Sequence, residues 1–162
     1  MIYGKWIPPT GDHADALALR MDVFVREQGF SEALETDALD AQSYHAVLYE
    51  KGDLVATGRL YYEGDAFHIG RFCVRKDHRG QGLGDLLLRM MLDKALQHHA
   101  ARFRIDAQTQ AVPFYARYGF TACGPEYLEE HVPHMPLFAL ATDLRLESPC
   151  AHACADCAQR TE

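Results

Sequence analysis

Val74-Arg75-Lys76-Asp77-His78-Arg79-Gly80-Gln81-Gly82-Leu83-Gly84 is followed directly by Asp85-Leu86-Leu87-Leu88-Arg89-Met90-Met91-Leu92. An apolar segment precedes this stretch, and apolar residues recur at spacings of three and four after it, which predicts a strand, a glycine-rich turn and a helix. The first N–H groups of a helix lack partners within the helix, and together with the helix dipole they favour a phosphate. Glycine has no Cβ to hold a ligand away. The stretch therefore predicts a phosphate-binding loop.

The order of residues separates the known classes of phosphate loop. A Walker loop would end in Gly-Lys-Ser or Gly-Lys-Thr, whereas this loop ends in Gly-Leu-Gly-Asp. The dinucleotide fingerprint needs a third glycine where Asp85 stands. Residues 79–84, which we call the glycine loop, match R/Q-x-x-G-x-G/A. They resemble the pyrophosphate loop of the GNAT N-acetyltransferase superfamily, which holds acetyl-coenzyme A.

Two further segments strengthen this resemblance. Residues 108–120, Gln-Thr-Gln-Ala-Val-Pro-Phe-Tyr-Ala-Arg-Tyr-Gly-Phe, look like the family's N-x-x-A-x-x-F-Y-x-x-x-G-F segment, with Gln108 where asparagine is usual. Residues 20–28, Arg-x-x-Val-Phe-Val-x-Glu-Gln, resemble the ElaA/YjcF-like subgroup of the superfamily. The resemblance covers roughly residues 2–146.

The predicted elements follow the GNAT order. Apolar patterning predicts strands at 2–7, 44–50, 54–62, 66–74, 102–108, 120–124 and 137–144, and helices at about 14–28, 82–100 and 111–118. We expect a short helix or turn in the acidic segment 31–42 and a polar loop at 125–136. The resemblance implies an α/β (α+β) GNAT fold, with a mixed, twisted sheet of about seven strands and helices on both faces. It also implies that strands 66–74 and 102–108 part to hold the pantetheine arm.

Length and composition limit the class of protein. A chain of 162 residues with 48% apolar and 24% charged residues is typical of one globular domain, here 1–146, followed by a tail at 147–162. The net charge of -7 argues against nucleic acid as a partner. The N-terminus lacks a signal-peptide layout and no apolar run has membrane-spanning length, so we expect a cytoplasmic protein without a membrane partner.

The resemblance also implies the residues that bind acetyl-coenzyme A. Backbone N–H groups of 81–85 would hold the pyrophosphate, with Arg79 adding charge. Backbone groups of 72–74 would pair with the pantetheine amides, and the Val74 N–H would polarise the thioester carbonyl. The full set of cofactor-binding candidates is Phe72, Cys73, Val74, Arg79, Gly80, Gln81, Gly82, Leu83, Gly84, Asp85 and Gln108.

Three residues are candidates for catalysis. Tyr115 matches the family's usual general acid, which protonates the sulfur of coenzyme A; the alternative is a packing aromatic. Glu27 and His134 are candidates for the general base, with Glu130 as a further one, and a chain of water molecules could replace all of them. The structural alternatives are that Glu27 pairs with Arg20 or Arg26 and that His134 simply ends a strand.

Two arginines also admit two roles. Arg59 and Arg71 could bind an anionic group of the acceptor inside the cleft, or they could pair with the acidic segment 31–42. We favour the ion pairs with the acidic segment.

The tail contains a cysteine cluster that a GNAT fold does not need. Cys150, Cys154 and Cys157, together with His152, could bind zinc or an iron–sulfur cluster. The alternatives are a tail that chelates metal adventitiously and a short helical turn with incidental cysteines.

The resemblance implies an acetyl-coenzyme A-dependent N-acetyltransferase that transfers the acetyl group directly in a ternary complex. The acceptor would be a small-molecule amine or a protein lysine, and homodimers are common in the superfamily. The alternative is a GNAT fold that binds acyl-coenzyme A without catalysis, as a sensor or interaction module, with a link to metal through the tail.

Overall fold

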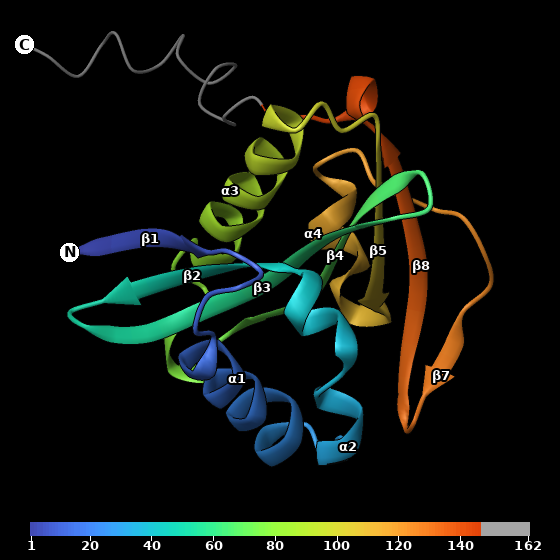
Figure 1. The fold of residues 1–162 in the computed structure, drawn as a ribbon. Coiled ribbons are helices and arrows are strands. Elements are labelled where there is room, and N and C mark those ends of the chain that lie inside the picture. Colours follow the sequence, from blue (N-terminus) through green and yellow to red (C-terminus); the bar gives the residue numbers. More distant parts are fainter. Residues whose placement is uncertain (147–162) are drawn as a thin grey trace, which may run out of the picture.

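The computed structural model describes residues 1–146, which form one sheet covered by helices (Figure 1). The strands are β1 (Ile2–Ile7), β2 (Tyr44–Glu50), β3 (Asp53–Glu63), β4 (Ala66–Val74), β5 (Arg102–Gln108), β6 (Thr121–Ala122), β7 (Tyr127–Glu129) and β8 (Val132–Leu140). The helical elements are α1 (Ala14–Arg20), the π-helix η1 (Met21–Glu27), α2 (Glu32–Glu35), η2 (Ala38–Gln42), η3 (Lys76–His78), α3 (Leu83–Gln97), η4 (Thr109–Ala111), α4 (Val112–Ala116) and η5 (Ala141–Asp143).

The sheet is mixed, as predicted. Its strand order is β1-β2-β3-β4-β5-β8-β6, and β7 pairs with β8. Among the strands of residues 1–146, only the β4–β5 pair is parallel, and the other neighbours are antiparallel. Parallel neighbours need a crossover, which α3 supplies between β4 and β5. The glycine loop therefore lies where the crossover leaves β4.

Helices cover both faces of the sheet, because successive side chains of one strand point to opposite faces. On β2, Ala46 and Leu48 belong to the main core beneath α3, whereas Val47 and Tyr49 cluster with Ala16 of α1. Figure 1 shows α1 and α3 on opposite sides of β2 and β3. The inward face of α3 is fully buried at Leu87, Leu88, Met91 and Leu92.

A bulge in β4 separates it from β5. Thr57 of β3 pairs with Cys73 and Arg59 pairs with Gly70, so two residues of β4 face Gly58 alone. Such an insertion bends the strand that carries it. Beyond the bulge β4 no longer pairs with β5, since their ladder is confined to residues 67–69 and 103–105. The separation that the resemblance implied is therefore present, and it lies directly before the glycine loop.

The last part of the chain differs from the prediction. Residues 125–136 are not a polar loop: β7 and the first half of β8 form a hairpin that turns at Glu130, whose φ is 52°. The final strand is β8, which ends at Leu140 instead of spanning 137–144. Pro133 and Pro136 make this strand hard to predict from the sequence, because proline cannot donate to a strand ladder and normally argues against a paired strand. In the described part of the chain the sheet thus has eight strands, one more than predicted.

The helical predictions need smaller corrections. The helix expected at 14–28 is α1 followed by the π-helix η1, and it ends before Gly29, whose φ is 79°. The helix expected at 111–118 is the short pair η4 and α4. Within residues 1–146 no helix is long and apolar enough to cross a bilayer.

No cluster that could hold a metal ion is present in the described part of the chain. The predicted metal ligands Cys150, His152, Cys154 and Cys157 lie outside the described residues. The zinc or iron–sulfur hypothesis therefore stays a prediction.

Candidate active site

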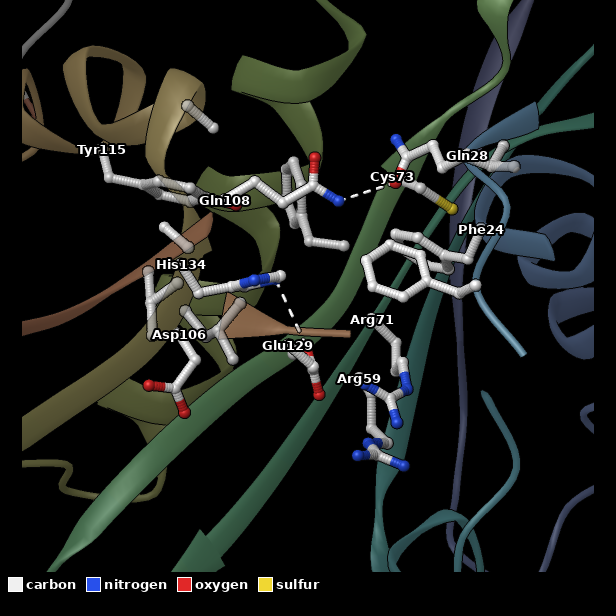
Figure 2. A pocket seen from close by; sticks show the side chains of 18 of the residues that line it. Phe24, Gln28, Arg59, Arg71, Cys73, Asp106, Gln108, Tyr115, Glu129 and His134 are labelled. Carbon is white, nitrogen blue, oxygen red and sulfur yellow. Dashed lines mark hydrogen bonds and ion pairs between the residues drawn. The ribbon is translucent and has the colours of Figure 1, made fainter. Parts of the chain in front are cut away.

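A cavity of about 510 Å³ opens where β4 and β5 part. One end, next to the glycine loop, is lined by aromatic rings of β4 and α4, including Phe72, Phe114 and Tyr115. The other end is polar and carries both signs of charge. Figure 2 shows Arg59 and Arg71 on one side of this end and Asp106 and Glu129 on the other. The cavity can thus hold a reacting group between an apolar wall and a charged one.

The glycine loop is shaped for close approach of a ligand. Gly80 and Gly82 have φ values of 75° and 78°, a region that other residues rarely adopt, and a Cβ at either would meet no protein atom within 4 Å. No side chain caps the N-terminus of α3 in the described part of the chain. Its first N–H groups therefore point out of the helix without a partner inside it.

The carboxylate of Asp85, in the first turn of α3, is bound by two other side chains. Its Oδ1 accepts hydrogen bonds from the Tyr118 hydroxyl at 2.6 Å and from Arg117 Nη2 at 3.0 Å. These contacts neutralise a carboxylate that would otherwise repel a phosphate at the helix N-terminus. The predicted contribution of Asp85 through its backbone N–H is compatible with this arrangement.

Tyr115 of α4 is 5% exposed and lines the apolar end. Its ring packs edge-on against Phe72, Phe114 and Phe120. Burial, and then the neighbouring Cys73, raise the pKa of Tyr115, so its hydroxyl stays protonated. Burial also raises the pKa of the Cys73 thiol to about 12.

His134 of β8 lines the cavity and has an oxygen atom near each of its ring nitrogens. Its Nδ1 lies 3.0 Å from the Val132 carbonyl oxygen, to which it must donate, and its Nε2 lies 3.3 Å from Glu129 Oε2. The ring stacks on Tyr127. Burial, and then Asp106, raise the pKa of Tyr127 to about 12. Figure 2 shows His134 between Tyr115 and Asp106, joined to Glu129 by a dashed line.

Glu27 does not line the cavity. Its two carboxylate oxygens accept hydrogen bonds from Arg79 Nη1 at 2.6 Å and Nη2 at 2.9 Å. The Arg79 hydrogen bond is the main cause of the lowered pKa of Glu27. The sequence-based partners were wrong: Arg26 pairs with Asp22, and Arg20 pairs elsewhere.

A buried ion-pair network holds the acidic segment against the cavity wall. Arg20, only 1% exposed, binds Glu35 and Asp40, and Arg59 also binds Asp40. Burial would raise the pKa of Asp40, but the hydrogen bonds from both arginines outweigh it and lower this pKa to about 2. Arg71 Nη2 donates to the Leu34 carbonyl oxygen at 2.7 Å. The favoured interpretation of Arg59 and Arg71, pairing with the acidic segment, is confirmed.

Gln108 closes the cavity from the side of β5. Its Nε2 donates to Gln28 Oε1 at 2.6 Å, across the gap that Figure 2 shows. His131 of the β7–β8 turn lies 2.8 Å from the Gln28 carbonyl oxygen, and the Glu130 carboxylate accepts from the Ser31 N–H. The turn after η1 and the β7–β8 hairpin therefore form a roof over the polar end.

Sequence analysis missed several residues of this end. Gln28, Phe24, Asp106 and Glu129 line the cavity but were not among the candidate site residues. Phe24 and Gln28 stand within the quoted segment 20–28, which was a usable signal. Asp106 and Glu129 lie on strands whose pairing through β8 carries no local signal.

The strand separation, the glycine loop and the cavity between them agree with the comparison to known families. Residues 12–139 match the family model of the acetyltransferase (GNAT) domain. The chain belongs to the GNAT acetyltransferase family. GNAT proteins use an acyl-coenzyme A cosubstrate, and the protein is therefore an acyltransferase.

Individual relatives agree with this assignment. The uncharacterized N-acetyltransferase YjcF of Bacillus subtilis is 35% identical over 124 residues, which cover 76% of this chain and 89% of YjcF. An acyl-CoA N-acyltransferase of Pseudomonas aeruginosa is 28% identical, with a TM-score of 0.77 over 85% of this chain and 99% of that one. Escherichia coli ElaA is 26% identical, with a TM-score of 0.77 over 85% and 99% of the two chains. The resemblance to the ElaA/YjcF-like subgroup is thus confirmed.

Proposed function

We propose that the protein transfers the acetyl group of acetyl-coenzyme A to a primary amine, either a small molecule or a protein lysine, in one direct step within a ternary complex. The observation that carries this proposal is the unpaired edge of β4. Residues 72–74 face a cavity that reaches the glycine loop at one end and the charged residues at the other. Donor and acceptor can therefore meet at one place.

The donor fits the apolar half of this cavity. The open glycine loop and the free N–H groups of α3 suit a diphosphate, and the edge of β4 offers backbone groups to the pantetheine amides. Burial of Cys73, whose pKa is about 12, keeps its thiol protonated and argues against an acetyl-enzyme intermediate. This supports direct transfer.

The reaction then needs one bond to form and one to break. The acceptor nitrogen attacks the thioester carbon, a C–N bond forms, and the C–S bond breaks. The Val74 N–H polarises the carbonyl oxygen. Tyr115 donates its proton to the leaving sulfur, and the acceptor nitrogen loses a proton to a base or to water.

His134 is the base that the geometry supports best. It lines the cavity, and because its Nδ1–H donates to the Val132 carbonyl oxygen, Nε2 of the neutral ring can accept the proton, and Glu129 lies beside it to stabilise the charge that forms. Glu27 lies outside the lining and is bound to Arg79. The Glu130 carboxylate is bound to Ser31 in the roof.

A cytoplasmic location and a homodimeric state remain predictions.

Calorimetry and a turnover assay test the proposal together. We expect one acetyl-coenzyme A site per chain, and release of coenzyme A when a panel of amines is supplied: a diamine, an amino sugar and a lysine-containing peptide. Binding without turnover on any amine would support the non-catalytic sensor instead. Absence of binding would reject both.

A further inference from the structure

The guanidinium of Arg79 is fixed from two sides. Nε donates to the Val74 carbonyl oxygen at 3.0 Å, while Nη1 and Nη2 donate to the two carboxylate oxygens of Glu27. A bidentate pair of this kind fixes the plane of the guanidinium as well as its position. The side chain of Arg79 thereby spans from the end of β4 to the end of η1.

These contacts leave part of the guanidinium available. Arginine carries five N–H donors, and Glu27 and Val74 occupy three of them. Within residues 1–146 the other two have no hydrogen-bond partner. Arg79 lines the cavity at its glycine-loop end. Glu27 does not line the cavity and forms an ion pair with Arg79. One free N–H lies on Nη2 at the edge that also carries Nε–H, and the other lies on Nη1 at the opposite edge, so one of them can face a ligand in the cavity.

Glu27 reaches Arg79 because of where η1 ends. This π-helix directly continues α1. π-Helices are rare in proteins, and those that occur are often found at functional sites. Val23 of η1 packs with Cys73 of β4, which fixes the helix against the strand that precedes the glycine loop. Glu27 is the last residue of η1, and the next residue, Gln28, lines the cavity.

We propose that Glu27 is a positioning residue for the donor: it orients Arg79 so that a free N–H group faces the diphosphate of acetyl-coenzyme A. This inference rests on the proposed function. It replaces the role of general base for Glu27 with one in donor binding. The effect of Glu27 should then appear only with donors that carry a diphosphate.

Two donors and three variants test this role. Glu27→Gln removes the carboxylate, Arg79→Gln removes the guanidinium, and Asp22→Asn is the matched control. Asp22 lies on the same helix and loses the same charge, but it pairs with exposed Arg26. KM is measured for acetyl-coenzyme A and for S-acetylpantetheine, which has the thioester arm but no diphosphate. Thermal unfolding checks that each variant folds.

We expect Glu27→Gln to raise KM for acetyl-coenzyme A about fivefold, which corresponds to losing the free energy of one partly exposed ion pair. We expect no comparable rise in KM for S-acetylpantetheine. The double variant should match Arg79→Gln alone, because Glu27 acts only through Arg79. Asp22→Asn should leave both KM values as in the wild type.

Three outcomes would overturn the inference while leaving the proposed function intact. Tighter binding of acetyl-coenzyme A by Glu27→Gln would mean that the carboxylate competes with the diphosphate. A loss of kcat shared by both donors would make Glu27 a base. Effects that add in the double variant would remove Arg79 from the explanation. If the wild-type protein neither binds nor turns over acetyl-coenzyme A, the proposed function fails and the inference fails with it.

Discussion

Replacing Tyr115 by phenylalanine tests the proposed general acid with little disturbance of the fold. The change removes one hydroxyl and keeps the ring, which makes the contacts with Phe72, Phe114 and Phe120. General acid catalysis contributes about a hundredfold or more. A thiolate needs less help than an alkoxide, so we expect kcat to fall about tenfold to hundredfold. That fall corresponds to about 1.4 to 2.7 kcal/mol of transition-state stabilisation.

The raised pKa of Tyr115 decides the pH range over which its phenol can donate a proton. Burial raises the pKa of Tyr115, which by itself makes the phenol a weaker acid. The sulfur becomes more basic as the C–S bond breaks and can take this proton. Since the pKa is raised above the ordinary value of about 10, we expect no loss of activity from Tyr115 ionisation below about pH 10.

The assay follows coenzyme A release at saturating acetyl-coenzyme A, with donor affinity measured separately by calorimetry. Tyr49→Phe is the control, because Tyr49 loses the same hydroxyl from the cluster beneath α1, where it donates to Asp15. We expect the control to keep wild-type kcat. A Tyr115→Phe protein that retains more than half of kcat would refute the assignment of this acid.

Further predictions concern Gly82, Asp40 and Cys73. Gly82→Ala places a Cβ on the open side of the loop at a φ of 78°, so we expect the Kd for coenzyme A to rise about tenfold by calorimetry; Gly64→Ala, at a φ of 64° in the β3–β4 hairpin, carries similar backbone strain and should leave Kd unchanged. Asp40→Asn leaves Arg20 and Arg59 without a shared buried carboxylate and should cost about 3 kcal/mol or more in denaturant unfolding. In the wild type the Asp40 pKa is lowered to about 2 from about 3.9, so its stabilisation is full above about pH 4 and disappears as the pH falls through 2; a flat stability profile over this range would contradict the network. Cys73, with a pKa of about 12, should carry no acetyl group when the reaction is quenched and the intact protein is weighed by mass spectrometry; a stoichiometric adduct would rule out direct transfer.

The sequence predicted the parts of the fold that depend on local patterns. The strand, the glycine loop and the long helix follow from apolar spacing and from three glycines in six residues. The β7–β8 hairpin was missed because Pro133 and Pro136 break the pattern of a paired strand. Both prolines lack a backbone N–H, yet β8 still pairs with β5 over seven positions.

The site was predicted less completely, because its contacts join distant parts of the chain. Glu27 and Arg79 lie 52 positions apart, and no local pattern links them. Gln108 was placed with the donor by its position in the motif, whereas its side chain bonds Gln28, 80 positions away. Residues at the glycine loop could be assigned because their function depends on backbone shape, which glycine spacing reveals.

Amide hydrogen exchange with and without acetyl-coenzyme A is the most direct test of the account. Binding through the edge of β4 and the start of α3 predicts slower exchange at residues 72–74 and 81–85, in the unpaired edge and the open helix end. Unchanged exchange in both segments at saturating acetyl-coenzyme A, or protection confined to another part of the chain, would contradict it.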